Sequence, residues 1–156
     1  MIFIDFNSYG GGSDTWIGLN DRDSENGFVW SDGSPFDYSL WNPKEPNDKY
    51  DQEDCAMRNK YVSGWNDDNC YKSKKIICKI MKGMPLLEPN DTFTTEYCDA
   101  DKKWLYFNDF CYLIVRYDSQ KYSDARQKCL DKKSDLLSIH SQHESNWLLE
   151  MVSKTV

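Results

Sequence analysis

Residues 45–55 read Glu-Pro-Asn-Asp-Lys-Tyr-Asp-Gln-Glu-Asp-Cys, and Trp-Asn-Asp follows at residues 65–67. Together the two stretches hold the densest group of carboxylate and amide side chains in the chain. The first stretch lies in a longer segment, residues 31–54, that carries three prolines and almost no regular hydrophobic pattern. Such a segment predicts a long loop, and ordered loops of this length usually have a function.

Five side chains in these stretches have the chemistry of calcium ligands. Calcium takes about six to eight oxygen ligands and accepts carboxylates, amide carbonyls and water in a flexible shell. We therefore expect a calcium site formed by Glu45, Asn47, Glu53, Asn66 and Asp67. For any one of them the alternative is an ordinary solvated position, because surface loops are rich in Asp, Asn and Glu. A bridge between the cysteines at 55 and 70 would clamp the site.

The composition limits the class of fold and the class of partner. The chain has 156 residues, of which 39% are hydrophobic, and this is enough for one domain with a buried core. A net charge of -7 argues against nucleic acid and anionic membranes as partners, because such surfaces need clustered Lys and Arg. No apolar stretch is long enough for direct membrane insertion.

Six cysteines form an even set without a Cys-x-x-Cys pair, which favours a disulfide framework in an oxidising compartment and therefore an extracellular protein. The six are Cys55, Cys70, Cys78, Cys98, Cys111 and Cys129. The start of the chain lacks the pattern of a signal peptide, so we expect a segment of a longer protein. Asn90 begins the one N-glycosylation sequon.

Short aromatic and β-branched runs predict strands in the first half of the chain. These runs are residues 16–19, 28–30, 55–57 and 75–80. Residues 81–96 contain two prolines and no period, so they predict a connector. After the connector, residues 105–107 and 110–115 flank Asn108-Asp109, which predicts a hairpin that brings Cys98 and Cys111 close enough to bridge.

Two helices are expected after the hairpin. Asp118 or Ser119 can cap the first helix, and Ser141 with Glu144 forms a capping box for the second. The first helix has three inward positions at helical spacing, Tyr122, Ala125 and Cys129. The second has an apolar face of four residues, Trp147, Leu148, Met151 and Val152. We expect these apolar positions to form core and not a ligand site.

Five motifs, in order and at near-identical spacing over residues 14–80, resemble the second half of a C-type lectin domain. They are Trp16-Ile17-Gly18-Leu19, Glu45-Pro46-Asn47, Glu53-Asp54-Cys55, Trp65-Asn66-Asp67 and Ile77-Cys78. The resemblance implies an α+β fold with two helices, short antiparallel sheets and a long calcium-binding loop, held by disulfides. It also implies a cis Glu45-Pro46 peptide and the calcium ligands named above.

The same resemblance implies a sugar ligand. Two adjacent sugar hydroxyls would bind the calcium while carboxylates accept their protons and amides donate to them. The order Glu45 then Asn47 implies equatorial 3- and 4-hydroxyls, the mannose, fucose and N-acetylglucosamine class, where a galactose site would have Gln-Pro-Asp. Glu88-Pro89-Asn90 repeats the triplet but lacks the motifs that follow the first one, so it is not expected to bind sugar.

An auxiliary calcium site is implied at the positions that match the family's second metal site. These positions are Asp21, Glu25, Asp48 and Asp54, and all four are acidic. Such a site would hold the long loop in its binding conformation. The alternative is that residues 21–25 form a solvated turn.

Residues 97–156 resemble the first half of a C-type lectin domain, so the halves stand in reverse order, with residues 1–80 as the second half and 81–96 as an interdomain-type linker. A cut through two adjacent domains of the mannose receptor family, which has tandem lectin domains, would give this order. Family pairing leaves Cys78 and Cys129 for each other. The chain could then close as a circular permutant, swap halves with a second chain, or stay partly open.

These observations favour a calcium-dependent lectin that binds mannose-type glycans on glycoproteins or microbial surfaces, with neighbouring lectin domains or a swapped second chain possible. The alternative is a protein-recognition module on the same fold that does not use calcium. An enzyme is not expected, because Glu53 and Asp54 are adjacent and would point to opposite faces of a strand. No nucleophile with a neighbouring base is evident in the sequence.

Overall fold

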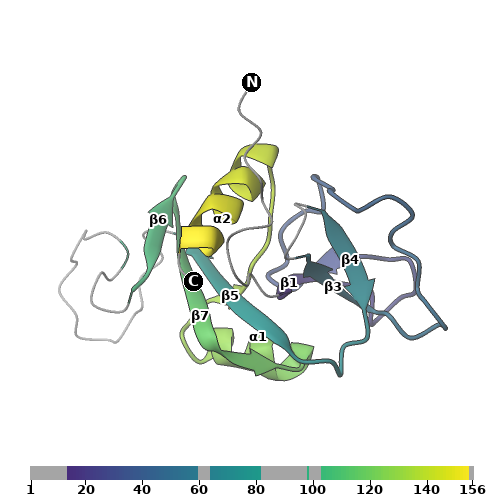
Figure 1. The fold of residues 1–156 in the computed structure, drawn as a ribbon. Helices are drawn as coiled ribbons and strands as arrows, with labels where there is room; N and C mark the ends of the chain where they lie inside the picture. Colours follow the sequence, from purple (N-terminus) through teal and green to yellow (C-terminus); the bar gives the residue numbers. More distant parts are fainter. Residues whose placement is uncertain (1–13, 60–63, 82–97, 99–102, 155–156) are drawn as a thin grey trace.

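The computed structural model describes residues 14–59, 64–81, 98 and 103–154 (Figure 1). The elements in chain order are β1 (Thr15–Asn20), β2 (Val29–Trp30), β3 (Cys55–Arg58), β4 (Trp65–Asp68), β5 (Lys74–Met81), β6 (Leu105–Phe107), β7 (Phe110–Gln120), α1 (Tyr122–Leu130), β8 (Asp135–Leu136) and α2 (Gln142–Lys154). The sequon at Asn90, the second Glu-Pro-Asn triplet and nearly all of the expected connector lie outside the described residues.

The described strands form one connected sheet in the order β4-β3-β1-β5-β7-β6, with β2 beside β1 and β8 beside β5. Strands β1 and β5 are parallel, with Thr15 opposite Lys75 and Trp16 opposite Ile76, and the other pairs are antiparallel. The expected short antiparallel sheets are therefore joined into a mixed sheet. Parallel neighbours need a long connection, which the long loop and the β3–β4 hairpin provide.

Strand β5 connects the two halves of the chain. It pairs with β7 from Ile76 opposite Val115 to Met81 opposite Phe110. A disulfide between Cys78 and Cys129 also joins β5 to α1. The other two disulfides are Cys55–Cys70 and Cys98–Cys111, and all three pairs are those expected above. The two segments are thus held together by a strand pair and a covalent bond.

The start of α1 differs from the expectation. Residues 118–120 belong to β7, which is longer than predicted, and the helix is preceded by Lys121 without a side-chain cap. The predicted cap at Asp118 or Ser119 is therefore wrong. Asp118 instead lies in the strand, and its carboxylate forms an ion pair with Lys128 of α1 and accepts a hydrogen bond from Gln120. The three inward positions of the helix are buried as predicted.

The hairpin and the second helix agree more closely with the sequence. Asn108 and Asp109 both have positive φ, 45° and 64°, which is the conformation of a tight two-residue hairpin turn. The hydroxyl of Ser141 accepts a hydrogen bond from the Glu144 N–H at 3.1 Å, so half of the capping box forms. The Glu144 carboxylate does not complete the box but accepts the N–H of His140 at 2.9 Å.

Two apolar clusters lie on opposite faces of the sheet. One contains Ile17 and Trp65 with Leu148 of α2, and the other contains Trp16 with Tyr122 and Ala125 of α1. Successive residues of β1 point to opposite faces, so Trp16 and Ile17 contribute to different clusters. Figure 1 shows α1 and α2 on either side of the β5–β7 pair.

A buried ionic network crosses between the two halves. The Lys79 ammonium lies 2.6 Å from the Glu144 carboxylate, and their side chains are 3% and 7% exposed. The Tyr112 hydroxyl donates to the same carboxylate at 2.7 Å, and Lys79 also donates to the Ser138 carbonyl at 2.8 Å. Burial lowers the pKa of Lys79, although Glu144 opposes the shift. The network therefore fixes β5, β7, α2 and the segment before α2 at one point.

Substitution of one partner in this network should be costly. Lys79→Met would leave the Glu144 charge buried and unpaired, and we expect a loss of about 3 kcal/mol or more in the free energy of unfolding. The double variant Lys79→Met with Glu144→Gln removes both charges but keeps an acceptor for Tyr112, so it should recover part of the loss. The measurement is urea unfolding with the disulfides intact. Lys128→Met, which breaks the more exposed pair with Asp118, should cost far less, because solvent screens that pair. Equal losses for Lys79→Met and Lys128→Met would contradict this role of the network.

Candidate functional site

The middle of the long loop is attached to β4 by backbone hydrogen bonds. The Trp65 N–H donates to the Leu40 carbonyl at 2.7 Å, and the Asn42 N–H donates to the Trp65 carbonyl at 2.8 Å. The Trp65 ring is fully buried and packs edge-on against Trp30 and Trp41. The loop therefore has its own aromatic core, which explains how a segment without regular secondary structure is held in one conformation.

The Asp67 carboxylate holds the Glu45–Asp48 turn against β4. Asp67 is fully buried, and its oxygens accept the N–H of Asn47 at 2.9 and 3.1 Å and the N–H of Asp48 at 2.6 Å. The Glu45-Pro46 peptide is cis, as the family resemblance implied. Four residues other than glycine have positive φ in and beside this turn, namely Lys44, Asp48, Tyr50 and Asp51. Such a backbone persists only where surrounding contacts hold it.

The carboxylates around this turn face one another. Burial raises the pKa of Glu45 to about 7, with further contributions from a hydrogen bond and from repulsion with Asp67. The Asn47 amide donates to Glu45 and partly opposes the shift. Burial also raises the pKa of Glu53, against the Lys49 N–H that it accepts, and the charges of Asp68 and Asp67 add to the rise. The site therefore holds more negative charge than its own cations neutralise.

The five expected primary ligands differ in how closely the structure brings them together. Glu45, Asn47 and Asp67 contact one another directly. Glu53 stands close enough for repulsion with Asp67, and its N–H donates to the Asp48 side chain at 3.0 Å. The Asn66 amide instead donates to the carbonyl of the next residue in β4.

A second acidic group contains three of the four residues expected for an auxiliary site. The Asp21 N–H donates to the Asp54 carbonyl at 3.1 Å, and one Asp21 oxygen accepts the Asn26 N–H at 2.9 Å. Burial raises the pKa of Asp21 to about 6, and the nearby charges of Glu25 and Asp54 contribute. The other Asp21 oxygen is buried without a hydrogen-bond partner. Asp48, the fourth residue, has its described contacts with Glu53 and Asp67.

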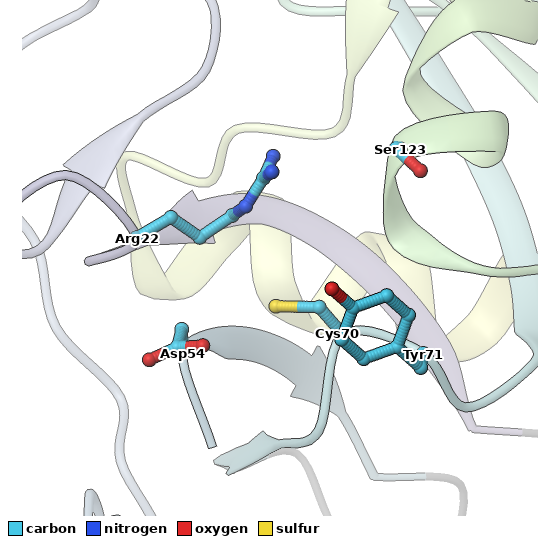
Figure 2. A pocket seen from close by; sticks show the side chains of 5 residues that line it. All are labelled: Arg22, Asp54, Cys70, Tyr71 and Ser123. Carbon is cyan, nitrogen blue, oxygen red and sulfur yellow. The ribbon is translucent and has the colours of Figure 1, made fainter. Parts of the chain in front are cut away.

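A small pocket of about 80 Å³ lies beside this second group. It is lined by Arg22, Asp54, Cys70, Tyr71 and Ser123. Figure 2 shows the Arg22 guanidinium and the Tyr71 hydroxyl extending into the space, with Ser123 on α1 opposite. Asp54 is the one member of the expected site residues that lines it. The second acidic group therefore contributes one residue, Asp54, to the wall of this pocket.

The chemistry of these donor groups can be compared with what a calcium ion requires. In the described residues no three His, Cys, Asp or Glu side chains are gathered as a ready metal site. Two features nevertheless fit a hard divalent cation: facing carboxylates with raised pKa values at Glu45 and Glu53, and the unpartnered buried oxygen of Asp21. Side-chain amides complete such a set, because calcium accepts them as readily as carboxylates. The residues present therefore suit the ion that the sequence indicated.

Two residues beside the site were not selected from the sequence. Asp68 is buried and raises the pKa of Glu53, but Lys72 and Lys74 hold the pKa of Asp68 itself low in spite of burial. Its position directly after Trp65-Asn66-Asp67 was the available signal. Tyr50 lies between the expected ligands Asn47 and Glu53 in the sequence. Its side chain is 80% exposed, and its backbone has a positive φ. It is the one aromatic residue in the acidic stretch 45–55, which could have indicated it.

The chain is similar to known lectin sequences. The family model described as Lectin C-type domain matches residues 6–80. Mouse C-type mannose receptor 2 is 30% identical over 146 residues, which are 92% of this chain and 10% of the receptor. Human lymphocyte antigen 75 is 34% identical over 130 residues, 81% of this chain and 7% of that protein. The chain thus spans a tenth or less of the length of these relatives.

A solved structure also matches. The C-type lectin CEL-I from Cucumaria echinata has 33% sequence identity and a TM-score of 0.37, over 38% of this chain and 43% of that one. Among the described helices of this chain, none combines the length and apolar character that a membrane span requires.

The raised pKa values predict how stability depends on pH when no metal is present. A carboxyl whose folded pKa exceeds its unfolded value stabilises the fold below the unfolded pKa, and this contribution is lost as pH rises through the folded pKa. Glu45 rises from 4.5 to about 7 and Asp21 from 3.8 to about 6. In the presence of a chelator, which removes calcium, the protein should therefore have a higher melting temperature at about pH 5.5 than at about pH 8.

The control variants separate these two groups from the rest of the protein. Glu45→Gln with Asp21→Asn should flatten the change in melting temperature between the two pH values. Asp118→Asn should leave it unchanged, because Lys128 keeps the pKa of that exposed carboxyl below the range tested. A wild-type melting temperature that stays constant or rises with pH would show that these two carboxyls do not govern stability in this range.

Proposed function

Because residues 6–80 belong to the C-type lectin domain family, we propose that this chain binds sugars of the mannose, fucose and N-acetylglucosamine class in a calcium-dependent manner. The observation that carries the proposal is the Asp67 carboxylate, which holds the Glu45–Asp48 turn against β4. That contact keeps a carboxylate and an amide side by side on a rigid turn. A site built in this way can bind a hydroxyl group as both donor and acceptor.

The proposed calcium ligands are Glu45, Asn47, Glu53, Asn66 and Asp67. The ion, when bound, would supply a positive centre that draws the lone pairs of two adjacent sugar hydroxyls. Glu45 and Glu53 would accept the protons of these hydroxyls, and the amides of Asn47 and Asn66 would donate to their oxygens. This requires Glu45 to be ionised, so its proton must leave when the ion binds.

Specificity is proposed to follow from the order of donor and acceptor. Glu45 and Asn47 are joined by a hydrogen bond across the Glu-Pro-Asn turn, so their acceptor and donor have a fixed arrangement. This order suits equatorial 3- and 4-hydroxyls, in keeping with the word mannose in the name of the mouse relative. Calcium at Asp21, Glu25, Asp48 and Asp54 would stabilise the base of the same loop.

The proposed setting is extracellular. Three disulfides and no free cysteine among the described residues suit an oxidising compartment. The proposed partners are mannose-type glycans on glycoproteins or microbial surfaces. The proposed role is binding without catalysis, as in the family to which residues 6–80 belong. Weak single sites of this kind gain strength when several act together.

The first test is retention of the oxidised protein on immobilised mannose. We expect retention in calcium that a chelator abolishes and that free mannose, but not free galactose, competes away. Glu45→Gln with Asn47→Asp should abolish the retention, because it exchanges the acceptor and the donor that face the hydroxyls. The matched control is the same exchange at the second triplet, Glu88→Gln with Asn90→Asp, which should leave retention unchanged. Flow-through by folded wild-type protein would favour recognition of protein instead.

We also propose that residues 14–81 and 98–154 close into one domain within a single chain, as a circular permutant. Three contacts support this closure: the β5–β7 strand pair, the Cys78–Cys129 disulfide and the Lys79–Glu144 ion pair. In a longer protein with tandem lectin domains the same surfaces would instead pair with neighbouring segments.

Closure is tested by mixing two isotopic forms of the chain before oxidation. We expect a monomer by light scattering, and a Cys78–Cys129 peptide whose two halves always carry the same isotope. Mixed-isotope peptides would show exchange of halves between chains. Free thiols at Cys78 and Cys129 would show that the domain stays open. Either result would reject closure without bearing on the sugar site.

A further inference from the structure

One buried charge in the described residues has no counter-charge. Lys74 and Lys79 are buried, and their ammonium groups pair with Asp68 at 2.5 Å and with Glu144 at 2.6 Å. Arg58, at the end of β3, is only 2% exposed. Its Nε and Nη2 are both buried and bond to no acceptor. Arg58 is therefore the exception in a fold that otherwise pairs its buried cations.

Two further donors among the described residues, on the same face of the sheet as Arg58, are also buried without a partner. Trp65 is the cross-strand partner of Arg58 in β4, so the two side chains lie on the same face of the sheet. The indole N–H of Trp65 is buried without a partner, and so is that of Trp30, whose ring centroid lies 5.5 Å from that of Trp65. N–H groups of three side chains on one face are thus unsatisfied.

This arrangement is unfavourable if nothing else binds there. An unpaired buried cation strongly destabilises the folded state, and each buried donor without an acceptor adds to that cost. Burial lowers the pKa of Arg58 to about 10, and no carboxylate of the described residues opposes the shift. Water could accept the hydrogen bonds, but it would leave the charge without compensation. An anion would accept the hydrogen bonds and also compensate the charge.

We propose that Arg58, with the indole N–H of Trp65, binds a small monovalent anion such as chloride between the sheet and the long loop. The anion would lie under the strand that carries Asp67, two residues beyond Trp65. It would neutralise Arg58 and stabilise the β3–β4 hairpin on which the loop is held. The proposal is independent of the sugar site, since none of its residues belongs to the proposed calcium ligands.

The test is the thermal unfolding of the whole oxidised chain at constant ionic strength, pH and calcium, with sodium gluconate replaced stepwise by sodium chloride. Gluconate is too large for a buried site. We expect the wild-type melting temperature to rise by about 4 °C at a tenfold excess of chloride over its dissociation constant, and to keep rising with the logarithm of the chloride concentration. Arg58→Met should lose this dependence. In gluconate Arg58→Met should be at least as stable as wild type, because the unpaired charge is gone.

The matched control is Arg22→Met, which removes an exposed arginine and should keep the full chloride dependence. A rise that Arg58→Met retains, or no rise in wild type, would overturn the proposal. A crystal soaked in bromide gives a second readout that needs no variant. An anomalous peak within hydrogen-bond distance of the Arg58 guanidinium supports the site. An ordered water or a protein carboxylate in its place overturns it.

Discussion

The pairing of β5 with neighbours on both sides is the constraint on which the rest of the structure depends. β5 lies parallel to β1, which leads into the long loop, and antiparallel to β7, which leads into α1. The same strand carries Cys78 and Lys79, so its register with β7 also decides whether the disulfide and the buried ion pair can form. A shift of one residue would turn Lys79 to the opposite face and away from Glu144. The apolar pattern and the polar network thus require the same register.

The candidate site depends on a second buried charge, the carboxylate of Asp67. Asp67 serves two purposes that oppose each other in the absence of a cation. Its oxygens satisfy the N–H groups of Asn47 and Asp48, which fixes the loop, and its charge repels Glu45 and Glu53, which disfavours the ionised site. A neutral residue would remove the repulsion but would also release the turn. The loop is therefore held in a form whose excess negative charge a divalent cation relieves.

Much of this arrangement could be predicted from the sequence, because short motifs with fixed spacing carry it. The motifs around Trp16, Glu45 and Trp65 indicated the family and the α+β fold, and the family comparison and the structure confirm both. The ligand roles of Glu45, Asn47, Glu53, Asn66 and Asp67 stay predictions. The sequence also indicated the Asn108-Asp109 turn, because few residues accept two successive positive φ angles.

The failures have a common cause, which is that tertiary contacts override local preference. Asp118 is a good capping residue, yet β7 continues through it because the strand is paired with β5 as far as Gln120. Lys79 reads as an exposed strand residue until its partner Glu144, far away in the sequence, is known. The burial of Arg58 could not be predicted either, since nothing in the sequence distinguishes a buried arginine from a solvated one. In each case the deciding partner lies on another element, so local patterns determine where strands, turns and motifs fall, whereas the pairing of buried charges emerges only from the assembled sheet.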